Sequence, residues 1–251
     1  MKVCLVQTDV YWEQKEANFA ELEEKLSEIV EAVDLVILPE MFSTGFSVNS
    51  ASLAEHPHTN TFKWLHQQAQ RLKTTIVGSF IIKENGAIKN RLMTVSSKGV
   101  ISEYDKQNLF SYGDETKLFT SGSSRSQFNV KDFNCSGLIC YDLRFPETAR
   151  NIGATYDCLL YVANWPTKRI EQWKKLLTAR AIENQCYVVG VNRIGTDGNG
   201  WEYNGQSMVV DFNGDVIADL GSEEKLEIVD LDKAALDEYR ERLPFLKDIK
   251  Y

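Results

Sequence analysis

Three short segments each bring one chemically useful side chain to the end of a strand-like run. They place Glu40 after Pro39, Lys106 after Asp105, and Cys140 after an apolar run. Cysteine is the strongest common nucleophile near pH 7, and a buried carboxylate can serve as its general base once burial raises the pKa of that carboxylate. A nearby lysine favours the thiolate and stabilises a developing oxyanion. The three residue types together suit a hydrolase with a cysteine nucleophile.

Histidine is a poor candidate for the base. The chain has only His56, His58 and His66, of which the first two flank a proline and the third lies on a polar helix face, so we expect all three at the surface. The sequence has no Gly-x-Ser-x-Gly, Walker or Gly-x-Gly-x-x-Gly motif. A zinc site would need more Cys or His ligands at close spacing. We therefore expect neither a metal nor an organic cofactor.

The three segments, residues 38–42, 104–110 and 138–147, jointly resemble the nitrilase superfamily of carbon–nitrogen hydrolases, whose catalytic set is Glu–Lys–Cys in this chain order. The resemblance covers essentially the whole chain. Further stretches look like the bacterial omega-amidases, which hydrolyse the terminal amide of 2-oxo acids such as 2-oxoglutaramate. These stretches are residues 161–166, 179–185, 189–193 and 197–200.

The resemblance implies a role for each residue of the set. Cys140 is the nucleophile and forms a thioester, and Glu40 is the base that takes the thiol proton, gives it to the leaving ammonia and later activates water. Lys106 and the backbone N–H of Tyr141 hold the oxyanion, and Glu115 matches the second glutamate of many family members. Each residue alone also has an ordinary structural interpretation, a free cysteine most often being a small core residue. Their joint order favours catalysis.

Four further side chains are candidates for the substrate pocket. Arg144 could bind a substrate carboxylate through two parallel hydrogen bonds, or pair with a structural carboxylate such as Glu147. Trp165, Phe42 and Phe46 could wall the pocket or simply pack in the core. The sequence leaves both pairs of alternatives open.

The elements that must position these residues alternate between strands and helices early in the chain, with hairpin-like runs in the middle and at the end. This order predicts an α/β fold with mixed sheets and helices on the outer faces, in one domain over residues 1–251. The resemblance implies a four-layer αββα sandwich. Expected strands are 3–7, 34–38, 75–82, 87–96, 99–104, 127–130, 136–140, 157–162, 187–192, 206–211, 216–219 and 226–230, and expected helices are 15–32, about 62–72, a short one from Pro146, 168–184 and 232–243.

Composition argues against some classes of partner, and the resemblance implies a small-molecule amide substrate. The 251 residues carry a net charge of −8, which argues against a nucleic-acid partner. No apolar run reaches 18 residues and no secretion signal is present, so we expect no membrane association. The five scattered cysteines fit a reducing cytoplasm. The resemblance adds the expectation of a homodimer.

Two other functions remain open. The same chemistry could act on an N-carbamoyl compound, a deaminated-glutathione-like amide or a nitrile, and residues 163–166 favour the omega-amidase. Alternatively the chain could be an interaction module that has lost catalysis, although a module would need none of Glu40, Lys106 and Cys140.

Overall fold

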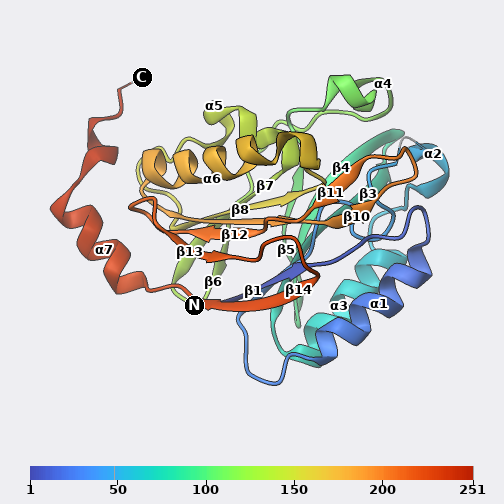
Figure 1. The fold of residues 1–251 in the computed structure, drawn as a ribbon, viewed down its shortest axis with the longest axis horizontal. Coiled ribbons are helices and arrows are strands. Elements are labelled where there is room, and N and C mark those ends of the chain that lie inside the picture. Colours follow the sequence, from blue (N-terminus) through green and yellow to red (C-terminus); the bar gives the residue numbers. More distant parts are fainter. Residues whose placement is uncertain (48, 251) are drawn as a thin grey trace.

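The computed structural model describes residues 1–47 and 49–250 and contains two six-stranded sheets that face each other, with helices outside both (Figure 1). This is the predicted four-layer αββα sandwich. The first sheet has three parallel strands, β1, β2 and β3, with β14 antiparallel to β1. In spatial order its strands are β14 (Lys225–Asp230), β1 (Lys2–Gln7), β2 (Leu35–Ile37), β3 (Thr75–Glu84), β4 (Ala87–Ser96) and β5 (Gly99–Asp105).

The second sheet has three parallel strands, β7, β8 and β9, at its centre. Every residue of β8 and β9 is buried, as expected for strands covered on both faces. In spatial order its strands are β13 (Val216–Asp219), β12 (Met208–Val210), β9 (Tyr187–Asn192), β8 (Cys158–Ala163), β7 (Phe133–Ile139) and β6 (Phe128–Val130); a separate hairpin joins β10 (Ile194–Thr196) to β11 (Glu202–Asn204).

The helices cover the outer faces of the sheets (Figure 1). Helices α1 (Lys15–Ser27) and α3 (Asn60–Leu72) cover the first sheet, and α5 (Pro146–Ala149) and α6 (Ile170–Asn184) cover the second, while α7 (Lys233–Arg242) extends beyond the sheets. No helix within the described ranges has the length and apolar character to cross a membrane. The shorter helices are α2 (Ser50–Leu53), α4 (Glu115–Leu118) and the 3₁₀ turns η1 (Ser111–Gly113), η2 (Cys140–Arg144), η3 (Thr167–Arg169) and η4 (Phe245–Asp248).

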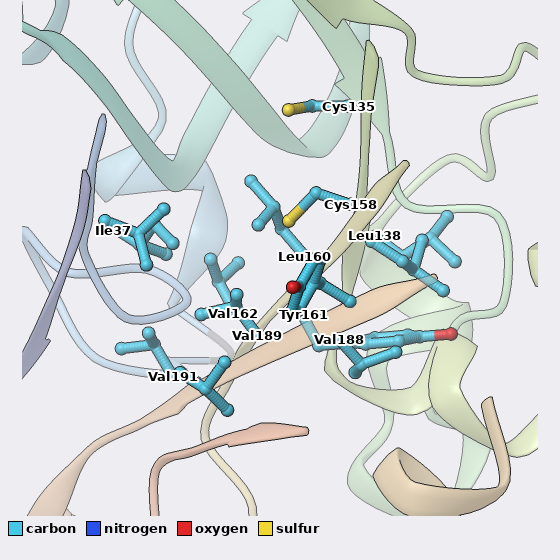
Figure 2. Close-up of a cluster of buried hydrophobic side chains, with 14 of the residues drawn as sticks. Ile37, Cys135, Leu138, Cys158, Leu160, Tyr161, Val162, Val188, Val189 and Val191 are labelled. Carbon is cyan, nitrogen blue, oxygen red and sulfur yellow. The ribbon is translucent and has the colours of Figure 1, made fainter. Parts of the chain in front are cut away.

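The main core lies between the sheets and continues under α6. Figure 2 shows Ile37 of β2 beside Val162 and Val191 of the second sheet, all completely buried. A second apolar cluster, which includes Leu26 and Leu65, joins α1 and α3 to the first sheet. Burial of apolar area on both sides of each sheet fixes the strand ends that carry the candidate residues.

The structure departs from the sequence predictions most clearly at two boundaries and at one missed hairpin. The first helix ends at Ser27 rather than at 32. The helix was predicted too long because the apolar spacing continues into the connection after it, where Val30 is 95% exposed. The strand expected at 136–140 starts earlier, at Phe133, and ends at Ile139. The β10–β11 hairpin is missed, because its three-residue strands flank a Gly-rich run that reads as a turn.

Candidate active site

Each of the three chemically useful residues follows the carboxyl end of a strand. Lys106 comes directly after β5 and Cys140 directly after β7, while Glu40 lies three positions beyond β2. Because the two sheets pack face to face, these strand ends meet at one edge of the sandwich. The backbone of Cys140 has φ +46°, in the left-handed region that non-glycine residues seldom adopt, so the chain turns sharply where β7 ends.

Lys106 lies between two carboxylates. Its Nζ donates to Oε1 of Glu40 at 3.0 Å and to Oε2 and Oε1 of Glu115 at 2.9 and 3.1 Å. All three side chains are completely buried. The structure therefore brings together Glu40 and Lys106, from the connections after β2 and β5, and Glu115 of α4, which is 75 positions from Glu40 in the sequence.

Two asparagines that the sequence reasoning did not assign fix the orientation of Glu40. The Nδ2 of Asn90 donates to Glu40 Oε1 at 2.8 Å. The backbone N–H of Asn164 donates to Oε2 at 2.9 Å, and its Nδ2 donates to the Glu40 carbonyl at 2.7 Å. Asn164 lies inside the quoted stretch 161–166, but Asn90 is a polar residue in the middle of β4, a position that reads as solvent-facing in the sequence.

The Cys140 thiol faces the same group. Its Sγ donates to the carbonyl oxygen of Asn164 at 3.8 Å. Burial raises the pKa of the Cys140 thiol well above its ordinary value, and the Glu40 carboxylate raises it further, while Lys106 opposes the shift. The thiol is therefore protonated near neutral pH and needs a base in order to attack.

The charges of the buried triplet do not cancel, because two carboxylates share one ammonium. Burial raises the pKa of Glu115, the Glu40 carboxylate adds to this shift, and Lys106 opposes it. Burial lowers the pKa of Lys106, but the carboxylates of Glu115 and Glu40 outweigh it, so the net shift is upward. Lys106 thus stays a fixed positive charge beside the thiol.

A buried carboxylate holds the turn that carries Cys140. Asp142 accepts from the Tyr104 hydroxyl at 2.8 Å, from the backbone N–H of Ile139 at 3.0 Å and from that of Asn108 at 2.9 Å. The bonds from Tyr104 and Asn108 join β5 and the segment after it to η2, and all three bonds fix η2. The N–H of Tyr141 lies in the first turn of η2, where backbone donors have no partner within the helix.

A cavity opens at the thiol. Of the predicted pocket residues, Tyr141, Arg144, Trp165 and Phe46 line it. Phe42 does not, and this corrects the prediction: it is completely buried in the cluster against α3, packed on Trp64. The complete lining is Glu40, Phe46, Lys106, Phe110, Gly113, Cys140, Tyr141, Arg144, Asn164, Trp165, Pro166, Arg169, Asp197, Trp201 and Tyr203.

Arg144 does not take the structural form expected of it, because within the described residues it makes no ion pair with Glu147. Its other expected role, contact with a substrate carboxylate, stays a prediction. Its guanidinium lies 4.8 Å from the ring centre of Trp165 and donates to Gln172 Oε1 at 2.5 Å. One planar face is therefore packed on an aromatic ring, and the side chain still reaches the cavity.

The β10–β11 hairpin supplies a wall that the sequence did not predict. Asp197, Trp201 and Tyr203 line the cavity from this hairpin, and the Tyr203 hydroxyl donates to Asp197 Oδ2 at 2.9 Å. None of the three histidines lines the cavity. Among the described residues, no group of three or more His, Cys, Asp or Glu side chains is placed to hold a metal ion.

Comparison with known proteins gives consistent matches over the full length. The sequence profile described as carbon–nitrogen hydrolase matches residues 2–241. The chain is 39% identical to "Omega-amidase YafV" of Escherichia coli (strain K12), covering 99% of this chain and 96% of that protein. It is 33% identical to "2-oxoglutaramate amidase" of Bacillus subtilis (strain 168), covering 99% and 97%. XC1258 from Xanthomonas campestris, a CN-hydrolase superfamily protein solved with an arsenic adduct in its active site, superposes with a TM-score of 0.97 at 36% identity, covering 100% of this chain and 97% of that one.

Proposed function

Because the chain belongs to the carbon–nitrogen hydrolase family, we propose that it is an omega-amidase. It hydrolyses the terminal amide of 2-oxo dicarboxylic acid monoamides, such as 2-oxoglutaramate and 2-oxosuccinamate, to the 2-oxo acid and ammonia. Full-length relatives named for this activity support the substrate. The single observation that carries the mechanism is the buried group in which Lys106 joins two carboxylates beside the Cys140 thiol.

Acylation begins when Glu40 takes the proton of the Cys140 thiol and the sulfur attacks the amide carbon. The C–N bond then breaks, the proton passes from Glu40 to the nitrogen, and ammonia leaves a thioester on Cys140. A base is needed because burial keeps the thiol protonated. The hydrogen bonds from Asn90 and Asn164 hold the carboxylate in position.

Lys106 and the N–H of Tyr141 stabilise the oxyanion. The ammonium is fixed and charged before the substrate arrives, so it needs little reorganisation when negative charge develops on the carbonyl oxygen. Glu115 keeps Lys106 in place and opposes its deprotonation.

Deacylation uses the same base in reverse. With ammonia gone, Glu40 takes a proton from water, the hydroxide attacks the thioester carbon, and the C–S bond breaks. The proton returns to the sulfur and the 2-oxo acid leaves. We propose that Arg144, Trp165 and Tyr141, which line the cavity, contact the substrate.

An ammonia-release assay tests this function with four substrates: 2-oxoglutaramate, glutamine, a nitrile and an N-carbamoyl amino acid. We expect 2-oxoglutaramate to give the highest kcat/KM. A higher value for the nitrile or the carbamoyl compound would replace the proposed substrate while keeping the chemistry.

The matched control for this assay is Cys140→Ala, which should fold and release no ammonia. Acid quenching during turnover, followed by peptide mass analysis, should find the acyl adduct on Cys140. Cys135, a buried cysteine of β7, provides the internal comparison. Wild-type turnover in Cys140→Ala, or an adduct on another cysteine, would show that the nucleophile is misassigned.

We also propose that the chain forms one domain and works as a cytoplasmic homodimer. The five cysteines are free in the structure, which suits a reducing compartment.

Exposed apolar side chains on α6 and β13, namely Ile182, Val216 and Ile217, offer a surface for a second subunit. Light scattering should give twice the chain mass, and a single-chain mass at working concentration would contradict the dimer.

A further inference from the structure

Arg169 lies in the wall of the active-site cavity, and the proposed mechanism does not use it. It is the last residue of η3, and its guanidinium lies 5.5 Å from the ring centre of Phe110 and 5.4 Å from that of Trp201. Aromatic rings attract a cation without supplying the negative charge that would neutralise it. The two rings therefore hold the guanidinium in place and leave its charge available.

Among the described residues, no acidic side chain neutralises the positive charge of Arg169. Over residues 1–47 and 49–250, no carboxylate oxygen lies within 4.0 Å of the side-chain nitrogens of Arg169, and these nitrogens make no hydrogen bond. Asp197 shares the cavity wall, but its oxygens already accept from Tyr203 and from the backbone N–H groups of Asn199 and Trp201. The N–H donors of Arg169 thus remain available to a ligand.

The cavity consequently has two electrostatically different ends. At the thiol, Lys106 is fully engaged by Glu40 and Glu115. At the other end, Arg169 also lines an adjoining surface hollow together with Tyr112 and Lys168, which places it at the rim. A negatively charged group of the substrate should bind most favourably at this rim, where the cation Arg169 is unpaired. The neutral amide group should lie at the other end, beside Cys140.

We propose that Arg169 binds the carboxylate of the 2-oxo acid amide and determines the preference for anionic amides. This inference rests on the proposed omega-amidase function and adds a second guanidinium to Arg144 on the same wall. Arg144 already donates to Gln172, whereas the donors of Arg169 are free for the planar, two-bond recognition that carboxylates receive from guanidinium groups.

The test compares Arg169→Gln with wild type on 2-oxoglutaramate and on pentanamide, a neutral amide of the same chain length. Losing a charge-assisted bidentate contact should lower kcat/KM for 2-oxoglutaramate by roughly 10–100-fold, mainly through KM, and leave pentanamide unchanged. Lys168→Gln is the matched control, because Lys168 is the exposed neighbour that does not line the cavity. Arg169→Lys should recover only part of the loss.

A binding measurement separates this role from turnover. In the Cys140→Ala background, calorimetric titration with 2-oxoglutarate should show a similar rise in Kd when Arg169→Gln is added. An unchanged Kd, or equal losses on both amides, would overturn the role of Arg169 and leave the proposed function standing. A wild-type enzyme that releases no ammonia from 2-oxoglutaramate would overturn the function, and this inference with it.

Discussion

At the scale of single residues, the site depends on how each carboxylate, cation and thiol changes the protonation of the others. Glu40 raises the pKa of Cys140, whose proton it is proposed to remove. The same carboxylate raises the pKa of Glu115, and Lys106 opposes that shift. The Lys106 ammonium lies within hydrogen-bond distance of both carboxylates and is their shared counter-charge.

Replacing Glu40 by Gln should have two opposite effects: turnover should fall, and the Cys140 thiol should ionise more easily. Without a general base, turnover should fall at least ~10²-fold. Loss of the negative charge should also lower the pKa of Cys140, because the carboxylate raises it, so iodoacetamide should alkylate this thiol at a lower pH than in wild type. Rapid-quench acylation and the pH profile of alkylation measure the two effects.

Glu241→Gln, on the exposed face of α7, controls for loss of one acidic charge and should change neither measurement. A normal acylation rate in Glu40→Gln would remove Glu40 as the base. An alkylation profile shifted to higher pH would contradict the electrostatic coupling.

At the scale of elements, the sequence predicted the central strands, because runs of apolar residues must be covered on both faces. The grouping of Glu40, Lys106 and Cys140 was predictable from their segments, whereas the contact of Asn90 with Glu40 was not, since a polar residue within a strand gives no sign of facing inward. Phe42 was wrongly placed because Met41, at φ +46°, turns the chain and sends the next side chain into the core. The β10–β11 hairpin was missed because three-residue strands carry too little periodicity.

Two glycines of that hairpin test how firmly it is anchored. Gly195 (φ +87°) and Gly200 (φ +77°) share a left-handed backbone, so alanine at either position should cost about 1–2 kcal/mol. A Cβ on Gly195 would also lie 2.2 Å from Asp9 Oδ1, which pairs with the buried Arg193, whereas a Cβ on Gly200 meets open space. Gly195→Ala should therefore lower the free energy of unfolding by more than Gly200→Ala does, and it should raise KM by tilting the wall that carries Tyr203.

Urea denaturation and steady-state kinetics of the two variants measure these effects. Because Asp9 is 41% exposed, the extra loss should stay below the ~3–5 kcal/mol typical of a fully buried pair. Equal losses in both variants would mean that Asp9 moves aside at no cost and that Arg193 does not anchor the hairpin.

At the scale of the whole molecule, burial makes the protein sensitive to alkaline pH. Burial, with a contribution from Glu227, raises the pKa of the Cys4 thiol to about 12, and burial raises that of the Tyr187 hydroxyl to about 12. The folded protein therefore keeps protons that the unfolded chain releases at about pH 9 and 10. Stability is fully present below pH 9 and falls as pH rises towards 12.

The free energy of unfolding, measured by urea titration, should fall above pH 9 by about 1 kcal/mol per pH unit for Cys4 alone. Cys4→Val keeps an apolar side chain in β1 and should make the decline between pH 9 and 11 less steep, with no change of slope below pH 8.5. The same slope in both proteins would show that Cys4 is not the group that titrates.

The pairing of β1 with β14 joins residues separated by almost the whole chain, from the N-terminal amine to the Leu231 carbonyl 230 positions later. The sheet that positions Glu40 and Lys106 gains its outermost strand, β14, only after its other five strands have been synthesised. Until then β1 has an open edge to which another nascent strand can pair. Pairing with β14 covers β1 and leaves the partly exposed β14, with its charged Lys225, Glu227 and Asp230, as the outer edge of the sheet.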